Sequence, residues 1–415
     1  MFVLATCCSL LTQVYQSDAQ SKDLSIEFAL KQSIANPSRV AGELAAIRLA
    51  SANEKTTPSV FQPDPEVRIT QVDRWSGNDE QEYSLRLRTK NPWVLKSERK
   101  AHGHRIEMAQ EQLEVRKWQI QHQTKYLYFE ALYAQKTYDL LKDWQVALQE
   151  NLKWHESLLE SSQQTLPEVL EVRIETNKAI RDARKAQLNY QKALNVLLSW
   201  INHSPLPSRS KTIELTTDFS PADSIEGNWD EEKIYKEYSF GHPLPKTFLA
   251  LESIAQAQVQ GADAGHKPWV SFLQAGVSQS SNSWEGDDWR FRVGIEVPIF
   301  NQQNKLTDAA RAQQDFARSQ LEAHLFESRL QIREKIANVE FAARHLKLTE
   351  SLTRNILDQV SGTLDEDRAT PTLSPNTRFR LQRGIHRMNE SNLEAQYALQ
   401  QAIIELEYFQ PLETN

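Results

Sequence analysis

The second half of the chain repeats the first at a spacing of about 206 residues. The segment Ile34-Ala-Asn-Pro37-Ser matches Phe240-Gly-His-Pro243-Leu, and each opens an alanine-rich helical segment. Farther along, the segment from Tyr83 to Trp93 matches the segment from Trp289 to Ile299 at the same spacing. An internal repeat constrains a fold more than total length does. The sequence therefore predicts a tandem duplication that covers nearly the whole mature chain.

The repeat and the leader divide the chain into four segments. We expect an export signal at residues 1–19, a first structural repeat at 20–212, a linker or equatorial segment at 213–230, and a second structural repeat at 231–415. The leader is apolar and uncharged up to Asp18, as in the h-region of an export signal. Cleavage after Ala19 is favoured, and lipidation of Cys7 or Cys8 after a lipobox-like sequence stays an alternative.

Composition and charge argue against several classes of function. A net charge of -7 and a pI near 5.9 offer no clustered basic surface for nucleic acid. Both cysteines lie in the leader, so the mature chain has no disulfide and no cysteine-ligated metal. His102 and His104 would point to different faces of a helix, and no nucleophile with a base, HExxH motif or phosphate loop is present. We expect no enzyme, no cofactor and no metal site.

Two stretches of more than 60 residues contain almost nothing that would stop a helix. From Glu98 to Glu160 there is no proline and glycine occurs only at position 103, which allows a helix of roughly 90 Å at 1.5 Å per residue. The second copy runs from Gln303 to Asp367. Apolar residues recur every seven positions in both stretches, which indicates coiled-coil packing. They are Ile106, Leu113, Ile120, Leu127, Ala134, Leu141 and Leu148 in the first stretch and Leu325, Ile332, Val339, Leu346 and Val360 in the second, where Thr353 is the only polar member.

Each long helix is expected to turn at a proline and return as a shorter helix. The breaks fall at residues 165–167 and 370–375, where a proline can end one helix and begin the next. The return helices are expected at 168–201 and 376–409. Since these are about half as long as the outgoing helices, the segments at 25–53 and 231–264 could stack on them end to end.

Alternating residues predict a β-hairpin between the short and long helices of each half. The last strand has apolar side chains at every second position from Trp289 to Val297, with Arg290 and Arg292 between them. The stretch around Leu85 and Arg86 is its counterpart, and partner strands are expected at 67–72 and 269–277. A soluble sandwich can show the same alternation, but nine or ten such residues with a tryptophan at the rim favour an outer-membrane strand.

The alternation also predicts what each face of the hairpins contacts. Four strands are too few to close a membrane barrel, because the smallest bacterial ones have about eight, so three chains would supply twelve. The residues expected to face lipid are Leu85, Leu87, Trp289, Phe291, Val293 and Ile295. The residues expected to line an anion-favouring lumen are Arg86, Arg88, Arg290 and Arg292. The tryptophans expected in an interface girdle, or else in a core, are Trp75, Trp269, Trp284 and Trp289.

The order of helix, hairpin, long helix, tip and shorter helix, found twice, resembles the TolC family of outer-membrane efflux proteins. The segment from Ala29 to Pro37 resembles the opening helix of that family, and Val297-Pro-Ile-Phe300-Asn resembles its strand-to-helix turn. The resemblance implies a mainly α protein with a small β part. Three copies would form a trimeric α-barrel that reaches about 100 Å into the periplasm, and a twelve-stranded β-barrel in the outer membrane of a Gram-negative cell.

The same resemblance implies a passive channel that exports small molecules or metal ions. Its partners would be two further copies of the chain, a periplasmic adaptor protein, an inner-membrane pump and outer-membrane lipid. The segment from Val297 to Asn304 resembles the cobalt, zinc and cadmium efflux branch more than the drug branch, but the cargo stays open. The alternatives are a soluble periplasmic adaptor built on a helical hairpin, which would normally have one hairpin, and a secreted coiled-coil protein, which would leave the strand alternation unexplained.

The tips of the helical hairpins depart from the family pattern. Arg173 and Arg378 stand near the positions where family members commonly have acidic residues, so an acidic constriction is not expected. We expect one of these arginines to latch the resting state through an acid such as Asp365 or Asp367, and ordinary surface charges are the alternative. The residues predicted to form the periplasmic tip or gate are Pro167, Arg173, Asp365, Asp367, Pro371, Pro375 and Arg378.

Overall fold

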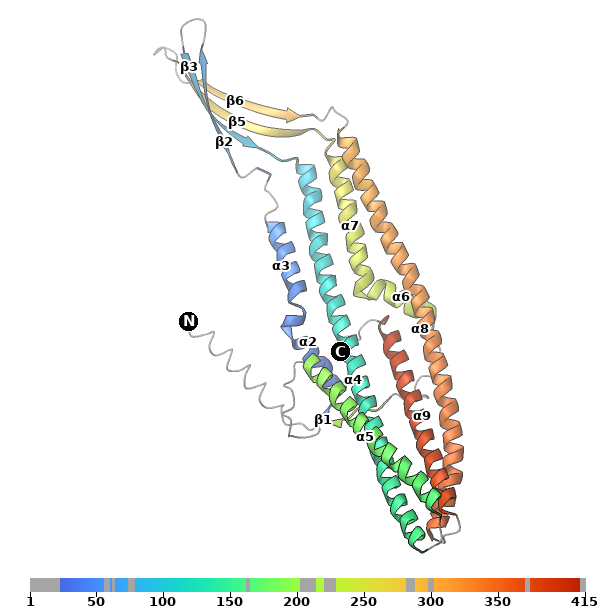
Figure 1. The fold of residues 1–415 in the computed structure, drawn as a ribbon. Helices are drawn as coiled ribbons and strands as arrows, with labels where there is room; N and C mark the ends of the chain where they lie inside the picture. The colour runs from blue at the N-terminus through green and yellow to red at the C-terminus, as the bar shows by residue number, and fades with distance from the viewer. Residues whose placement is uncertain are drawn as a thin grey trace, which may run out of the picture. The chain divides into compact units, whose positions relative to one another are not determined.

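The computed structural model has the same order of elements in both halves of the chain (Figure 1). It describes residues 23–55, 60–61, 64–73, 79–161, 165–201, 214–219, 229–280, 288–297, 302–369 and 374–410. The first half contains α2 (Ile26–Ala35), the 3-10 turn η1 (Pro37–Arg39), α3 (Ala41–Lys55), β2 (Glu66–Asp73), β3 (Asp79–Arg88), α4 (Pro92–Glu160) and α5 (Leu166–Trp200). The second half contains α6 (Glu231–Gly241), α7 (Pro243–Ala264), β5 (Trp269–Ser280), β6 (Asp288–Glu296), α8 (Gln302–Ala369) and α9 (Pro375–Glu407).

The prediction of a mainly helical chain with four strands is confirmed. The long helix α4 begins at Pro92, six positions before the predicted start. Asn91 explains the difference, because its Oδ1 atom accepts hydrogen bonds from the backbone N–H groups of Trp93 and Val94 at 3.0 and 3.4 Å. None of the helices in the described ranges has an apolar stretch long enough to cross a membrane. The predicted export signal lies outside the described residues.

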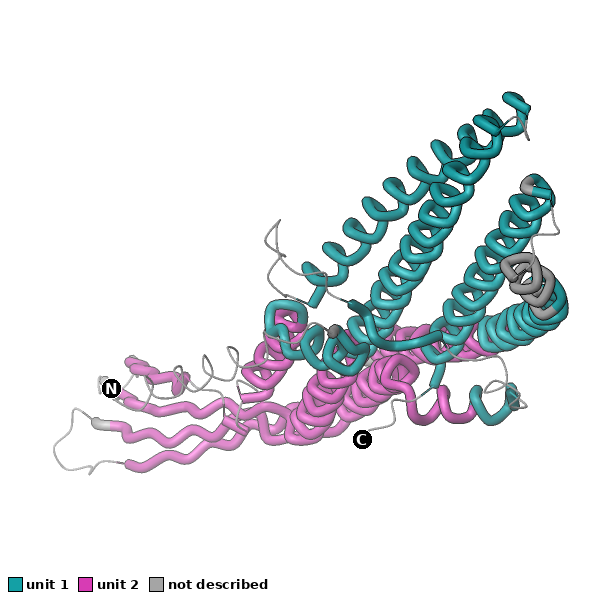
Figure 2. Tube along the Cα trace, turned by 90° about the horizontal axis from the view of Figure 1, so that it is seen from below, with its two compact units in different colours: residues 1–39, 117–235, 331–415 teal, residues 40–116, 236–330 magenta. Residues whose placement is uncertain are grey.

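The chain forms two compact units, which Figure 2 shows in different colours. Unit 1 comprises residues 1–39, 117–235 and 331–415, and unit 2 comprises residues 40–116 and 236–330. Both long helices contribute residues to both units, because α4 and α8 each cross a unit boundary.

Unit 1 is held together by a core of large apolar side chains from α4, α5 and α9. Tyr128, Leu132, Leu197 and Leu198 are fully buried in it, and Ile404 of α9 packs against them. Tyr133 and Tyr397 stack with their ring centroids 4.3 Å apart. Full burial of side chains of this size is the main stabilising contribution to such a helical unit. Several heptad positions are buried, as the seven-residue pattern predicted: Ile120, Leu127 and Leu148 of α4 and Ile332, Val339 and Leu346 of α8.

A short parallel strand pair lies beside the core of unit 1. The strand β1 (Asp23–Leu24) pairs with β4 (Glu214–Leu215), which falls in the segment predicted as a linker. The Tyr128 hydroxyl donates to the Leu24 carbonyl at 2.8 Å, and the Leu215 N–H donates to Gln135 Oε1 at 2.9 Å. These hydrogen bonds satisfy backbone groups that a two-residue strand pair leaves open.

Unit 2 contains a four-stranded antiparallel sheet of order β2-β3-β5-β6. The two predicted hairpins are present, and the pairing of β3 with β5 joins them into one sheet. The strand β3 begins at Asp79 and β6 begins at Asp288. Polar side chains do not interrupt backbone pairing, so the ladder of the first hairpin continues to Asp73 and Asp79.

Candidate functional site

One face of the sheet is apolar and exposed. Along one row of the register, Val67, Leu85, Ala275 and Phe291 lie side by side on the four strands. Phe291 is 76% exposed and Val67 is 71% exposed. Residues two positions away continue this face on each strand. The other large exposed side chains on it are Ile69, Tyr83, Val270, Leu273, Trp289, Val293 and Ile295.

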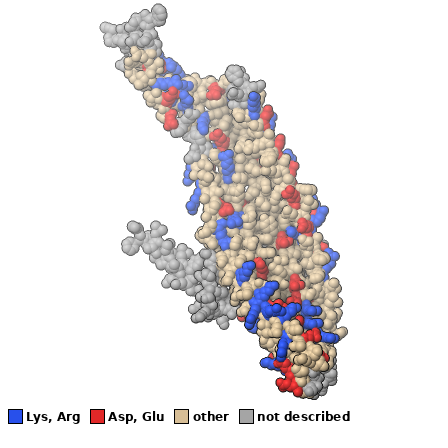
Figure 3. Space-filling view, viewed as in Figure 1, with Lys and Arg blue, Asp and Glu red and all other residues tan. Residues whose placement is uncertain are grey.

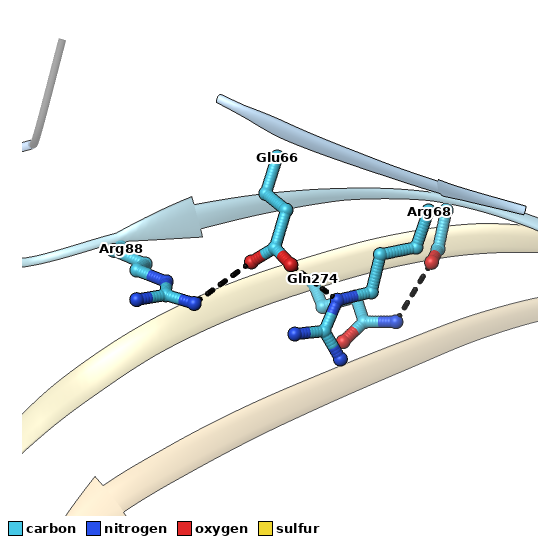
Figure 4. Close-up of polar contacts among 5 residues, drawn as sticks. Glu66, Arg68, Arg88 and Gln274 are labelled. Carbon is cyan, nitrogen blue, oxygen red and sulfur yellow. Dashed lines mark hydrogen bonds and ion pairs between the residues drawn. The ribbon is translucent and has the colours of Figure 1, made fainter. Parts of the chain in front are cut away.

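The opposite face of the sheet is polar and is linked by side-chain hydrogen bonds and ion pairs. Glu66 of β2 accepts from Arg68 at 2.7 Å and from Arg88 of β3 at 3.1 Å (Figure 4). Gln274 of β5, also labelled in Figure 4, donates to Ser84 Oγ at 2.8 Å. Polar residues are the buried ones on this sheet: Glu82, Ser84, Gln274 and Ser278.

A buried carboxylate connects β3 with β6 across the intervening strand. The Glu82 side chain is only 7% exposed, and its Oε2 atom lies 3.0 Å from Arg292 and 3.8 Å from Arg290. Gly276 of β5 provides the space for this contact. A Cβ atom at that position would lie 2.8 Å from the Cβ of Ser84 and 3.4 Å from Glu82 Oε1. The glycine therefore helps Glu82 to reach the arginines of β6.

The structure sorts the predicted sheet residues onto two faces. Arg86, Arg88, Arg290 and Arg292 share the polar face, and the register places all six residues predicted to face lipid on the apolar face. Contact of these faces with lipid and with a lumen remains a prediction. Glu82, Gln274 and Gly276 were not predicted, because their partners lie on strands distant in sequence.

The register places two of the tryptophans predicted to form a girdle or a core on opposite faces of the sheet. Trp289 pairs with Val277 on the apolar face, whereas Trp269 pairs with Glu296 on the polar face. A register shift between Val270 and Phe272 moves the start of β5 relative to a regular ladder. Trp75 and Trp284 lie outside the described residues.

A side-chain hydrogen bond joins the tips of the two helical hairpins within unit 1. Glu168 of α5 accepts a hydrogen bond from the Asn376 amide of α9 at 2.7 Å. The same carboxylate accepts from the backbone N–H and the hydroxyl of Thr165 at 3.0 and 2.9 Å. These hydrogen bonds, those from Thr165 first, hold the pKa of Glu168 below its usual range. The sequence did not predict this contact.

The arginines predicted to form a gate have partners inside unit 1. Arg173 contacts Glu156 of its own hairpin at 2.6 Å, and the Arg378 guanidinium lies 5.4 Å from the ring centroid of Trp154. The side chains of Asp365 and Asp367 and the whole of Pro371 lie outside the described part. Pro167 and Pro375 lie in the first turns of α5 and α9, where a proline disturbs no helical hydrogen bond.

Basic side chains gather on the return helix α5. On the face of unit 1 drawn in Figure 3, blue side chains lie over this helix. The exposed basic residues of α5 are Arg173, Lys178, Arg181, Arg184, Lys185 and Lys192.

The described residues contain no candidate metal centre. Within the ranges that the structure describes, no three histidine, cysteine, aspartate or glutamate side chains are grouped to hold a metal ion. His104 lies 2.8 Å from Glu107 of its own helix, in an exposed pair.

Comparison with known proteins gives matches among solved structures. No protein-family model and no curated protein matches the sequence. CusC, described in a study of transmembrane channel formation, superposes with a TM-score of 0.72 at 15% identity, over 93% of this chain and 92% of that one. The MtrE outer-membrane channel of Neisseria gonorrhoeae superposes with a TM-score of 0.68 at 13% identity, over 92% of this chain and 88% of that one. The chain has the fold of these channels.

A third structure extends the comparison to another organism. The outer-membrane protein VceC from Vibrio cholerae superposes with a TM-score of 0.66 at 14% identity, over 92% of this chain and 95% of that one. At such sequence identities the similarity is one of fold, and it covers almost the whole length of both chains. The resemblance to TolC-type channels is therefore confirmed at the level of the fold.

Proposed function

We propose that the chain is the outer-membrane channel of a tripartite efflux system, a passive conduit that belongs to the TolC-type family. Three copies would assemble in the outer membrane of a Gram-negative cell and extend their helices into the periplasm. Superposition on CusC and MtrE over more than nine tenths of this chain supports the proposal.

The observation that carries the proposal is the distribution of side chains on the sheet of unit 2. One face of the sheet is apolar and exposed, whereas the buried polar side chains of Glu82, Ser84, Gln274 and Ser278 belong to the other face. A contiguous exposed apolar face of this kind is unusual in a protein surrounded by water, and it marks contact with lipid or a partner. In an outer-membrane strand, apolar residues face lipid and polar residues face a wet interior.

The two edges of the sheet support assembly from several copies. Among the described strands, β2 pairs only with β3 and β6 pairs only with β5. An open edge of backbone N–H and C=O groups is costly inside a bilayer, where no water can satisfy these groups. Pairing the β2 edge of one copy with the β6 edge of the next closes three four-stranded sheets into one twelve-stranded barrel.

The helical ends provide the surface for the proposed partners. A periplasmic adaptor would contact the hairpin tips and an inner-membrane pump would supply the energy. The exposed basic residues of α5 favour an adaptor that presents acidic side chains there.

The cargo is less constrained than the channel. By the register, the polar face of the sheet has five arginines, at positions 68, 86, 88, 290 and 292, and five acidic residues, at positions 66, 80, 82, 288 and 296. These charges balance, so the net charge of this face favours neither cationic nor anionic cargo. The proposed channel therefore leaves the cargo open, and the predicted heavy-metal branch stays a prediction.

Expression of the full chain in a Gram-negative host tests the proposal. The chain should be recovered in the outer-membrane fraction as a detergent-stable trimer, and the purified trimer should open discrete conducting pores in planar lipid bilayers. Recovery as a soluble periplasmic monomer would contradict the channel and favour the adaptor alternative.

A further inference from the structure

A cavity of about 720 Å³ lies in unit 2, where β3 and β5 meet the beginning of α4 and the end of α7. We infer that this cavity binds a small organic anion, a molecule with one carboxylate on an apolar body. Its basic and aromatic lining residues include Arg86, Arg88, Lys90, Trp269 and Phe272. The site is formed by a single chain, so binding does not depend on the proposed channel function.

Arg86 provides a cation that the protein does not neutralise locally. It lies directly opposite Glu66 in the register, but the Glu66 carboxylate is engaged by Arg68 and Arg88. The Arg86 guanidinium instead lies 3.6 Å from the ring centroid of Phe272. Among the described residues no carboxylate pairs with it. An anion in the cavity would therefore meet a guanidinium that does not first have to leave an ion pair.

Phe272 gives the cavity an aromatic wall in a fixed place. It lies opposite Gly294 on the polar face, and a Cβ atom at that glycine would overlap its ring. The glycine thus allows the ring to lie flat across β6, beneath the guanidinium of Arg86. Val94 and Leu306 add further apolar surface to the lining. An apolar body can contact these side chains while its carboxylate meets Arg86.

Two N–H donors at the cavity have no acceptor. Arg86 Nε and Trp269 Nε1 are both buried, and neither has a hydrogen-bond partner among the described residues. Buried donors are normally satisfied, so each such exception requires an explanation. A carboxylate offers two acceptor oxygens, and we assign these to the two donors.

The other charges at the cavity limit the ligand to a single negative charge. Glu98 and Glu296 also line it, so a polyanion would be repelled. Arg88 is already paired with Glu66, which leaves Arg86 and Lys90 as the cations that face the cavity. These two cations would repel a metal ion, so metal binding in the cavity is disfavoured.

Isothermal titration of the purified full-length chain in a non-ionic detergent tests the site, with benzoate as the probe and neutral benzamide as its control. We expect one benzoate per chain and at least tenfold weaker binding of benzamide. Arg86→Lys keeps the charge but removes the Nε–H donor, and Trp269→Phe keeps a ring but removes the indole N–H. Each should weaken benzoate binding about tenfold, the effect of losing one hydrogen bond to a charged group.

Matched variants on the same sheet provide the controls. Arg292→Lys and Trp289→Phe make the same chemical changes outside the cavity lining and should leave the benzoate Kd within about twofold. If Trp269→Phe fails to fold, the benzoate affinity of Arg86→Lys alone tests the site. Absence of benzoate binding, equal binding of benzamide, or equal binding by Arg86→Lys and Arg292→Lys would each overturn the site. A conducting trimer that binds no benzoate removes only the site, and a chain that binds benzoate but forms no pore removes only the proposed function.

Discussion

The helices of unit 1 and the sheet of unit 2 place apolar side chains in opposite ways. In unit 1, Tyr128 and Leu198 are fully buried and basic residues such as Arg181 lie outside. In the sheet, Phe291 is 76% exposed, whereas the Glu82 side chain is 7% exposed. Both regions obey the same rule, that apolar groups avoid water. The difference lies in the surroundings, since the sheet has the pattern expected next to lipid and the helices have the pattern expected in water.

The contrast also separates two sources of stability. The core of unit 1 gains its stability within one chain, because its apolar side chains already contact each other. The apolar face of the sheet gains little within one chain, because the side chains on it remain exposed. We therefore expect substitutions in unit 1 to act on folding and substitutions on the sheet to act on insertion and assembly.

The largest expected effect comes from a charge on the apolar face of the sheet. Phe291→Arg should abolish trimer assembly, because an arginine at the midplane of a bilayer costs about 2–4 kcal/mol in such barrels and three copies add their costs. Unheated gel electrophoresis of the outer-membrane fraction measures the trimer. The neighbouring substitution Arg292→Ser, on the polar face, is the control and should assemble normally. Similar behaviour of the two variants would show that the faces are assigned wrongly.

A cavity in the helical core should have the next largest effect. Leu198→Ala removes a fully buried side chain from unit 1 and should cost about 2–5 kcal/mol in the free energy of unfolding. Thermal unfolding followed by circular dichroism would show a lower Tm. Leu188→Ala, at a position on α5 that is 65% exposed in the single chain, serves as the comparison. A loss below about 1 kcal/mol in Leu198→Ala would contradict the buried core.

Periodicity in the sequence predicted the elements that depend on local pattern. The seven-residue spacing predicted α4 and α8, and the alternation around Phe291 predicted β6 and its two faces. Both signals are strong because a long helix and a two-faced strand repeat the same environment many times. The start of α4 was placed too late, since one capping residue, Asn91, determines it.

Contacts between distant segments were beyond the reach of that reasoning. The pairing of β3 with β5 and of β1 with β4 joins segments almost 200 residues apart. Partner choice was also not predicted, since the sequence did not indicate that Arg173 contacts Glu156. The latch between Arg173 or Arg378 and an acid such as Asp365 or Asp367 stays a prediction. Such choices depend on three-dimensional proximity, about which the spacing of residues along one helix says nothing.

Two substitutions at one ion pair should shift ion selectivity in opposite directions. Arg292→Ser removes a positive charge from the polar face, so the pore should become less selective for anions. Glu82→Gln removes the carboxylate that lies 3.0 Å from Arg292, so the pore should become more selective for anions. Reversal potentials across a planar bilayer in a KCl gradient measure both changes. Shifts of the same sign would show that this pair does not face the conducting path.

The arginines near the tips should have a smaller effect on conductance. Replacing Arg173 and Arg378 together with alanine removes the contacts to Glu156 and Trp154 and should raise single-channel conductance if either side chain helps to close the tip. Exposed ion pairs contribute little, roughly 0–1 kcal/mol, so the increase should be modest. Arg344→Ala, which removes an exposed charge paired with Glu340 on α8, is a control for the loss of charge alone. Unchanged conductance in an assembled trimer would exclude both arginines from the gate.

The smallest expected effect is a pH dependence of the contact between the tips. Hydrogen bonds from Thr165 and Asn376 hold the pKa of Glu168 below its usual range. A lowered pKa means that the contact is fully present above the usual pKa of a glutamate and is lost as the pH falls through the lowered value. Conductance should therefore rise in acid below the usual glutamate range. Asn376→Ala should raise conductance at neutral pH already, and Glu168→Gln should remove the acid-induced rise. An identical acid response in Glu168→Gln would assign the pH dependence to another group.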